Sequence, residues 1–159
     1  MRIVVISDSH RKCGAVYNII EAEPTARHIF FLGDVVEDIE DISLAFPDRI
    51  YHIVSGNCDG FSQYPTTDIA KIGAVNILYT HGHRHSVKSS VQPLVKLARE
   101  RECKIVLFGH THIARVEYQD GIYIVNPGSC AASREGKNSY AVIDIEDNGI
   151  MPIIKTENI

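Results

Sequence analysis

A buried strand followed by a polar loop is predicted by residues 3–10, Ile3-Val4-Val5-Ile6-Ser7-Asp8-Ser9-His10. Four consecutive apolar residues are typical of a strand that is covered on both faces. Further apolar runs end in the same way, in residues able to bind a metal, at Gly33-Asp34, Gly56-Asn57, His81-Gly82-His83 and Gly109-His110-Thr111-His112. Each motif alone is common in turns, so the prediction depends on their repeated placement behind strands.

The order of the expected elements indicates an α/β fold. Helical spacing predicts a helix around residues 15–20 and a shorter one around residues 39–46, each behind a strand. A hairpin is predicted over residues 69–80, and a helix over residues 91–98 with Ser89 or Ser90 as its cap. The rest of the chain, from a strand at residues 105–108 onward, has the pattern of strands joined by turns. This order predicts mixed sheets with helices outside, in which ligands bind beyond the carboxyl ends of the strands.

Composition and charge limit the classes of protein to which the chain can belong. With 159 residues and 45% hydrophobic content, we expect one compact domain over residues 1–159. A net charge of -4 without a long basic run argues against an extended nucleic-acid surface. The apolar run at residues 3–6 is too short for a signal peptide or a membrane span, so we expect no membrane contact and a cytoplasmic location. A homo-oligomer is compatible with the sequence.

Two further expectations concern the cysteines and one loop. Cys13, Cys58, Cys103 and Cys130 are too widely spaced for a zinc finger or a disulfide framework. All except Cys58 are expected to be buried thiols. The polar stretch from Phe61 to Asp68 is predicted to be a loop that can lie over the site.

The residue types in the motifs predict a site for two metal ions. Carboxylate, imidazole and carboxamide ligands suit borderline divalent ions such as Mn, Fe, Zn, Ni or Co. Two ions about 3.5 to 4 Å apart need a bridging ligand, for which Asp34 is the best candidate. Asp8 and His10, two residues apart, would share one ion. His110 and His112 would each serve one ion, and the second ion would be completed by His81 and Asn57.

The charge of such a site indicates its reaction. Two divalent ions, two carboxylates and one hydroxide leave a single positive charge, which matches the monoanion of a phosphodiester. A bound metal lowers the pKa of water from 15.7 to about 7, so hydroxide is available near neutral pH. The sequence therefore predicts hydrolysis by in-line attack on phosphorus, with Asp34, Asn57 and His81 as the catalytic residues and a small phosphodiester as substrate.

Several residues have two readings on the sequence alone. His83 and His85 either orient His81 or contact the substrate, and we favour the orienting role for His83. Asn126, in Asn126-Pro127-Gly128-Ser129, belongs either to a tight turn or to a wall of the pocket. Arg134 is as compatible with a solvated loop as with a phosphate contact. His28 and His52 are expected to be packed histidines without a functional role.

The ordered motifs, including Gly56-Asn57-Cys58-Asp59 and Asn126-Pro127-Gly128-Ser129, resemble those of the calcineurin-like metallophosphoesterases. The chain is most similar to their small single-domain bacterial and archaeal phosphodiesterase branch, from Met1 to about Ile154. The resemblance implies a four-layer αββα sandwich of two mixed β-sheets flanked by helices. It implies Mn as the metal, with Ni, Co, Fe or Zn as alternatives. It places one ion at Asp8, His10, Asp34 and His112, and the other at Asp34, Asn57, His81 and His110.

Cys58 departs from the pattern of many larger members, which carry a histidine there that can protonate the leaving oxygen. A neutral thiol is a poor substitute, so esters with strongly basic leaving groups should react slowly.

A eukaryotic branch of the family serves as a scaffold in the retromer trafficking complex, so a non-catalytic interaction protein is the second hypothesis. A phosphomonoesterase or a cyclic-nucleotide phosphodiesterase is the third.

Overall fold

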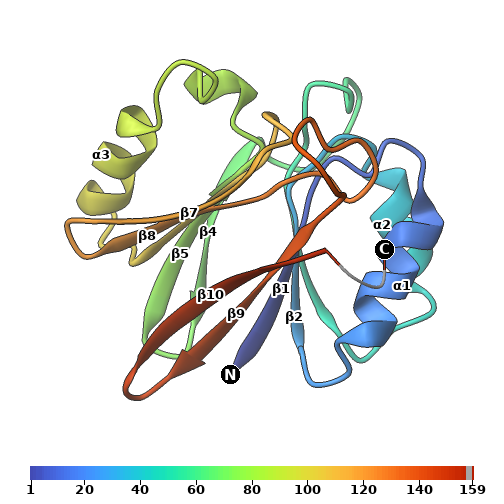
Figure 1. Cartoon of the computed structure of the whole chain (residues 1–159), viewed down its shortest axis with the longest axis horizontal. Helices are drawn as coiled ribbons and strands as arrows, with labels where there is room; N and C mark the ends of the chain where they lie inside the picture. Colours follow the sequence, from blue (N-terminus) through green and yellow to red (C-terminus); the bar gives the residue numbers. More distant parts are fainter. Residues whose placement is uncertain (157–158) are drawn as a thin grey trace.

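The computed structural model describes residues 1–156 and residue 159. Two five-stranded sheets pack face to face and carry helices on their outer sides (Figure 1). The elements follow one another as β1 (Arg2–Ile6), α1 (Cys13–Ala22), β2 (His28–Phe31), α2 (Glu37–Ser43), β3 (Ile50–Ile53), β4 (Thr67–Ile72), β5 (Val75–Thr80), the short 3-10 helix η1 (His83–His85), α3 (Gln92–Glu100), β6 (Ile105–Phe108), β7 (Ala114–Gln119), β8 (Ile122–Pro127), β9 (Tyr140–Glu146) and β10 (Gly149–Lys155).

Both sheets are mixed, as predicted. The first has the strand order β10-β9-β1-β2-β3, in which β1, β2 and β3 run parallel and β9 pairs antiparallel with β1. The second has the order β4-β5-β6-β8-β7, with β5, β6 and β8 parallel. Parallel strands end at the same edge, so the loops behind β1, β2 and β3, and those behind β5 and β6, are each brought together.

The buried side chains form three apolar layers, and together these give the predicted αββα order. Ile3 and Val5 of β1 point into the core between the sheets, while Val4 and Ile6 pack towards α1 and α2. Both faces of β1 are therefore buried, which explains why its sequence is a continuous apolar run. On the outer side of the second sheet, α3 contributes a third layer that contains Leu94 and Val95. The predicted four-layer fold is therefore confirmed.

Three local expectations need correction. The first residue of α3 is Gln92 and its cap position is Val91, although Ser90 Oγ does accept the Gln92 N–H at 3.1 Å. Thr67 and Asp68, predicted to be loop, belong to β4, where they pair with β5. Cys13 is exposed because it is the first residue of α1, where residues 11–14 are all exposed, so the expectation of a buried thiol was wrong there.

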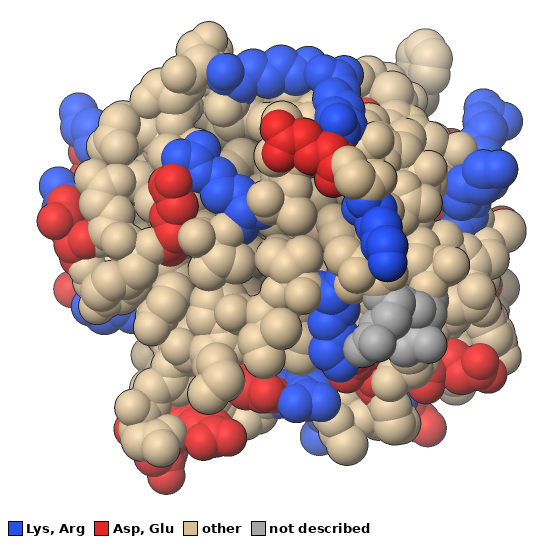
Figure 2. All heavy atoms as spheres, viewed as in Figure 1, with Lys and Arg blue, Asp and Glu red and all other residues tan. Residues whose placement is uncertain are grey.

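One face of the molecule shows mixed charge. On the face in Figure 2, basic and acidic side chains are interspersed rather than gathered in one row. That face offers no continuous row of cations to a phosphate backbone. None of the helices among the described residues has the length and apolar character needed to cross a bilayer.

His28 and His52 lie side by side on β2 and β3, away from the loops that carry the motifs. His28 Nδ1 and His52 Nε2 are 3.0 Å apart. The His52 ring stacks on Phe30, with the ring centroids 4.4 Å apart. Burial lowers the pKa of His52 to about 4, helped by the charge of His28 and opposed by Asp68. His52 is therefore a neutral, packed ring at pH 7, as expected for a histidine without a functional role.

His52 is expected to make the fold sensitive to acid. Its pKa is about 6.5 in the unfolded chain and lower in the folded one, so protonation of His52 favours the unfolded chain. The contribution of His52 to the unfolding free energy is therefore complete above pH 6.5 and is lost as the pH falls towards 4. Between pH 7 and pH 5, we expect the unfolding free energy of His52→Gln to fall by about 1 kcal/mol less than that of the wild type. This value allows for the partial exposure of the ring, which weakens the effect. Urea unfolding at both pH values measures this, and equal falls in wild type and variant would contradict it.

Candidate metal centre

The five motif loops meet at the carboxyl ends of β1, β2, β3, β5 and β6, along the upper edge of the two sheets in Figure 1. One group of side chains contains the residues predicted for the first ion. One ligand atom from each member lies within 4.8 Å of the others, and the members are Asp8, His10, Asp34 and His112. His112 Nε2 is 3.1 Å from Asp8 Oδ1 and 3.2 Å from His10 Nε2.

The second group surrounds the buried ring of His81. Its Nε2 atom is 3.2 Å from Asn57 Oδ1, 3.2 Å from His110 Nδ1 and 3.5 Å from Asp34 Oδ1. The other oxygen of Asp34, Oδ2, is 4.0 Å from His10 Nε2 in the first group. Asp34 therefore presents one carboxylate oxygen to each group.

Two of the histidine rings are oriented by backbone carbonyl groups. His81 Nδ1 is 2.7 Å from the Leu32 carbonyl, and His112 Nδ1 is 2.8 Å from the Ala132 carbonyl. A carbonyl oxygen only accepts, so Nδ1 of each ring donates to its carbonyl and Nε2 is the nitrogen that faces the centre. His112 Nε2 thus faces the carboxylate of Asp8.

Asp8 gives the clearest test of whether a cation fits. Its side chain is fully buried, and Oδ1 has no hydrogen-bond partner among the described residues. Burial alone would raise the pKa of Asp8, but contact with His112 and the charge of His81 lower it, and the same contact with Asp8 raises the pKa of His112. A buried carboxylate oxygen without a hydrogen bond is costly unless a cation binds there, and the Nε2 atoms of His81 and His112 beside it are further metal ligands. The donor set therefore fits a divalent metal ion.

The backbone at the centre is held in a conformation that side chains rarely adopt. Positive φ angles between 44° and 66° occur at five of the predicted ligands, Asp8, His10, Asp34, His110 and His112. The β-branched Val35 has a φ of 81°. Such angles cost of order 1 to 3 kcal/mol each and are found where a site imposes them.

Asp59, which was not among the predicted site residues, holds part of this strained backbone. Its Oδ2 atom accepts the N–H groups of Asp34 at 2.9 Å and Gly56 at 2.7 Å. Its Oδ1 atom accepts those of Val35 at 2.8 Å and Val36 at 3.0 Å. The carboxylate thus ties the loop behind β2 to the loop behind β3. Its position in Gly56-Asn57-Cys58-Asp59 was the available signal, because aspartate in a turn often accepts nearby backbone N–H groups.

Asn126 is buried behind the loop that carries His110 and His112. Its Nδ2 donates to the Gly109 carbonyl at 3.0 Å and to Thr111 Oγ1 at 2.9 Å, while Oδ1 accepts the Gly128 N–H. Asn126 lies near the end of β8, and its side chain positions the loop of the two histidines.

His83 and Arg134 lie at the periphery of the centre. The His83 ring centroid is 5.4 Å from that of His81, but no hydrogen bond joins the two among the described residues. The Leu32 carbonyl orients His81 instead. Arg134 is exposed on the loop behind β8, where its backbone N–H donates to the His112 carbonyl at 3.1 Å.

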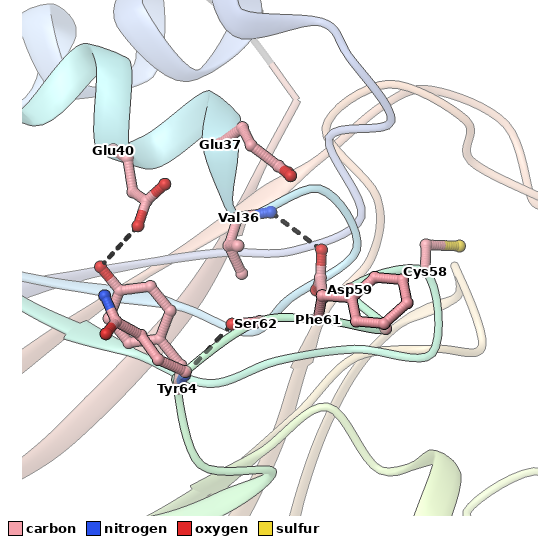
Figure 3. Close-up of a pocket in the computed structure, with 10 residues that line it drawn as sticks. Val36, Glu37, Glu40, Cys58, Asp59, Phe61, Ser62 and Tyr64 are labelled. Atoms are coloured by element: carbon pink, nitrogen blue, oxygen red, sulfur yellow. Dashed lines mark hydrogen bonds between the residues drawn. The ribbon is translucent and has the colours of Figure 1, made fainter.

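Cys58 lies between the centre and a cavity of about 410 Å³ (Figure 3). Its N–H donates to Asp34 Oδ1 at 2.9 Å, and its exposed thiol has a pKa raised to about 11 by partial burial and by the Asp34 carboxylate. The cavity is enclosed by the start of α2 and residues 58–64, with Tyr64 donating to Glu40 and the fully exposed Phe61 at its rim. The predicted loop therefore lies beside the centre.

The sequence model of the calcineurin-like phosphoesterase superfamily domain matches residues 1–148. The chain belongs to the calcineurin-like phosphoesterase superfamily. Among curated members, a probable metallophosphoesterase of Bacillus subtilis, YsnB, is 31% identical over 150 residues, which cover 93% of this chain and 86% of that protein. The predicted family is thus confirmed, and the group of Asp8, His10, Asp34 and His112 is the candidate metal-binding cluster of this calcineurin-like chain.

Solved structures of this superfamily share the fold. A predicted phosphoesterase from Streptococcus pneumoniae has a TM-score of 0.83 and 27% identity, with 98% of this chain and 88% of that chain covered. Vps29 of Entamoeba histolytica in complex with Zn²⁺ has a TM-score of 0.75 and 23% identity, covering 98% of both chains. A novel archaeal phosphodiesterase has a TM-score of 0.72 and 21% identity, covering 98% and 100%. The last two, below 25% identity, show the fold alone.

Proposed function

We propose that the protein is a dinuclear metal-dependent phosphodiesterase. One ion would be held by Asp8, His10, Asp34 and His112, and the other by Asp34, Asn57, His81 and His110. The observation that carries the proposal is the position of Asp34, whose two carboxylate oxygens face the two groups. That placement is what a bridging ligand requires.

The chemistry follows from the residues that surround the two positions. When bound, two divalent ions would polarise the phosphoryl oxygens and make hydroxide available near neutral pH. Asp8 and Asp34 supply the only carboxylates of the proposed ligand set, and Asn57 adds an oxygen without charge. The centre then keeps a net positive charge that suits the monoanion of a phosphodiester better than a monoester dianion. Leu32 and Ala132 hold the rings of His81 and His112 in position, so the ligand set is organised before substrate binds.

The surroundings support a small diester as substrate. The cavity of Figure 3 adjoins the centre at Cys58 and has room for one ester arm. No imidazole stands at position 58, so we propose that good leaving groups are preferred. Mn is the proposed metal, with Ni, Co, Fe or Zn as alternatives, and a cytoplasmic location is part of the proposal. The solved archaeal phosphodiesterase with the same fold is consistent with diester chemistry.

The test is a panel of substrates and metals. Protein stripped with a chelator is assayed with Mn, Ni, Co, Fe or Zn against bis-p-nitrophenyl phosphate, p-nitrophenyl phosphate, and 2′,3′- and 3′,5′-cyclic nucleotides. We expect diester hydrolysis that requires added metal, exceeds monoester hydrolysis and accompanies binding of two ions per chain. A stoichiometry of one ion, or activity that persists in the chelator, would contradict the dinuclear proposal.

A scaffold function is the second candidate, because Vps29, which is named a vacuolar protein sorting-associated protein, has the same fold and was solved in complex with Zn²⁺. Metal binding is therefore not sufficient evidence of catalysis. The same panel separates the candidates. Two bound ions with no hydrolysis of any ester would favour a protein partner, whereas preference for p-nitrophenyl phosphate or for a cyclic nucleotide would favour the remaining alternatives.

Cys58→His is expected to broaden the range of substrates. An imidazole at this position can protonate a leaving oxygen, which the neutral thiol does poorly, and such acid catalysis contributes about 10²- to 10⁴-fold. We expect an increase of at least about tenfold in kcat for diesters with alkoxide leaving groups, and little change for nitrophenolate, which needs no proton. Cys13→His, at an exposed cysteine on α1, is the matched control. An unaltered substrate range in Cys58→His would contradict this explanation.

A further inference from the structure

A second cavity, of about 220 Å³, adjoins the metal centre at the loop that carries His110 and His112. It lies at a different place from the cavity of Figure 3, which adjoins the centre at Cys58. Three cations, Lys88, Arg115 and Arg134, line the second cavity together with the Thr111 hydroxyl. None of the described residues that line it is acidic. We call it the cationic pocket.

Two of these cations are free to bind an anion. Arg115 pairs with Glu117 on its own strand. Lys88 and Arg134 are exposed and make no ion pair with any described residue. An exposed cation keeps its charge at little cost, so its lack of a partner is not by itself evidence of a ligand. An anion site is indicated because both cations line the same cavity, next to the loop that carries His110 and His112.

The positions of the two cations are linked to the metal centre. Thr111, which lines the pocket together with Lys88 and Arg134, lies between His110 and His112 in the chain. The loop of Arg134 is joined to His112 through its backbone hydrogen bond. An anion in the pocket would therefore be held in a defined relation to the reacting phosphate.

The floor of the pocket is apolar. It is formed by Val87, Phe108 and Ile113, of which Val87 and Phe108 are buried. Cations around an apolar floor suit a phosphate on a carbon framework, because the framework packs on the floor while the oxygens meet the cations. The cavity of Figure 3 differs in charge, since Glu37 and Glu40 line it and would repel a phosphate. The two cavities thus distinguish the two arms of a substrate.

We propose that the cationic pocket binds a second phosphate carried by one ester arm of the substrate. The substrate class is then a phosphodiester with an additional phosphate monoester, bound with the charged arm at Lys88 and Arg134 and the uncharged arm near Cys58. This inference rests on the proposed phosphodiesterase function, and it adds the part of the substrate that gives specificity.

The test compares two dinucleotides that differ only in a 5′-terminal phosphate. For the wild-type enzyme with its activating metal, we expect a KM about tenfold lower for the phosphorylated dinucleotide. In the double variant Lys88→Gln/Arg134→Gln this preference is expected to disappear, while KM for the unphosphorylated dinucleotide and for bis-p-nitrophenyl phosphate stays unchanged. Lys71→Gln on β4, an exposed lysine on a strand that does not line the pocket, is the control.

Different failures have different meanings. The inference is wrong and the diesterase function stands in two cases, both with bis-p-nitrophenyl phosphate cleaved. In the first, the wild type has equal KM values for the two dinucleotides. In the second, the double variant loses activity towards both dinucleotides equally. If inorganic phosphate accelerates cleavage of the unphosphorylated dinucleotide in the wild type only, the pocket binds a free anion, which also overturns the inference. If no diester is cleaved, the proposed function fails. Calorimetric titration of metal-free protein with the phosphorylated dinucleotide then tests the pocket, and equal affinities of wild type and double variant would overturn it.

Discussion

Asp34→Asn is expected to reduce metal-dependent diester hydrolysis by at least about three orders of magnitude, a loss of about 4 kcal/mol of transition-state stabilisation. The substitution keeps the size of the side chain but removes its charge. It also replaces one of the two oxygens that face His10 and His81 with an amide nitrogen, which donates and cannot bind a cation. Either orientation of the amide therefore leaves one of the two groups without its shared ligand.

Three measurements distinguish this effect from general damage. We expect Asp34→Asn to bind at most one ion per chain, and to lose most of the rise in melting temperature that added metal gives the wild type. Its unfolding in the chelator should remain cooperative. Asp41→Asn, an exposed aspartate on α2, should match the wild type in all three measurements. Full activity in Asp34→Asn would show that the proposed bridging role is wrong.

The fold could be predicted to the level of its layers. Strands buried on both faces leave a continuous apolar run, as in β1, and helices leave residues at three- and four-residue spacing, as in α3, so the type and order of these elements were readable. The neighbour of each strand was not. β9 pairs with β1 across nearly the whole chain, Ile3 with Ile143 and Val4 with Val142, and no local pattern specifies such a partner.

The candidate site could be predicted as a set of side chains, but not the groups that hold them. Asp8, Asp34 and the histidines are chemically distinctive, and each follows a strand. The acceptors that orient His81 and His112 are carbonyl oxygens of Leu32 and Ala132. Every residue carries a carbonyl, so no residue type marks this role. The two cavities were unpredictable for a related reason, since each is enclosed by segments distant in sequence.

Gly56→Ala is expected to damage the centre although it replaces none of the proposed ligands. A Cβ atom at Gly56 would lie 2.2 Å from Asp34 Oδ1 and 2.6 Å from Asp34 N. The second of these is a backbone atom held by Asp59 and cannot move independently. Gly33 approaches the same place from the other side, since a Cβ there would be 2.4 Å from Gly56 N. The loops behind β2 and β3 therefore come together at a distance that only glycine permits.

The loops must separate to accommodate the methyl group, and this moves the Asp34 carboxylate away from both groups. We expect the unfolding free energy to fall by about 2 to 3 kcal/mol, as in overpacked sites. We expect activity to fall by at least about a hundredfold, because displacement of a catalytic group by about 1 Å has effects of that size. Gly60→Ala is the matched control, since a Cβ there meets nothing within 4 Å. Urea unfolding and diester hydrolysis are measured for both variants. If Gly56→Ala retained wild-type activity, the close approach of the two loops would not be what positions Asp34.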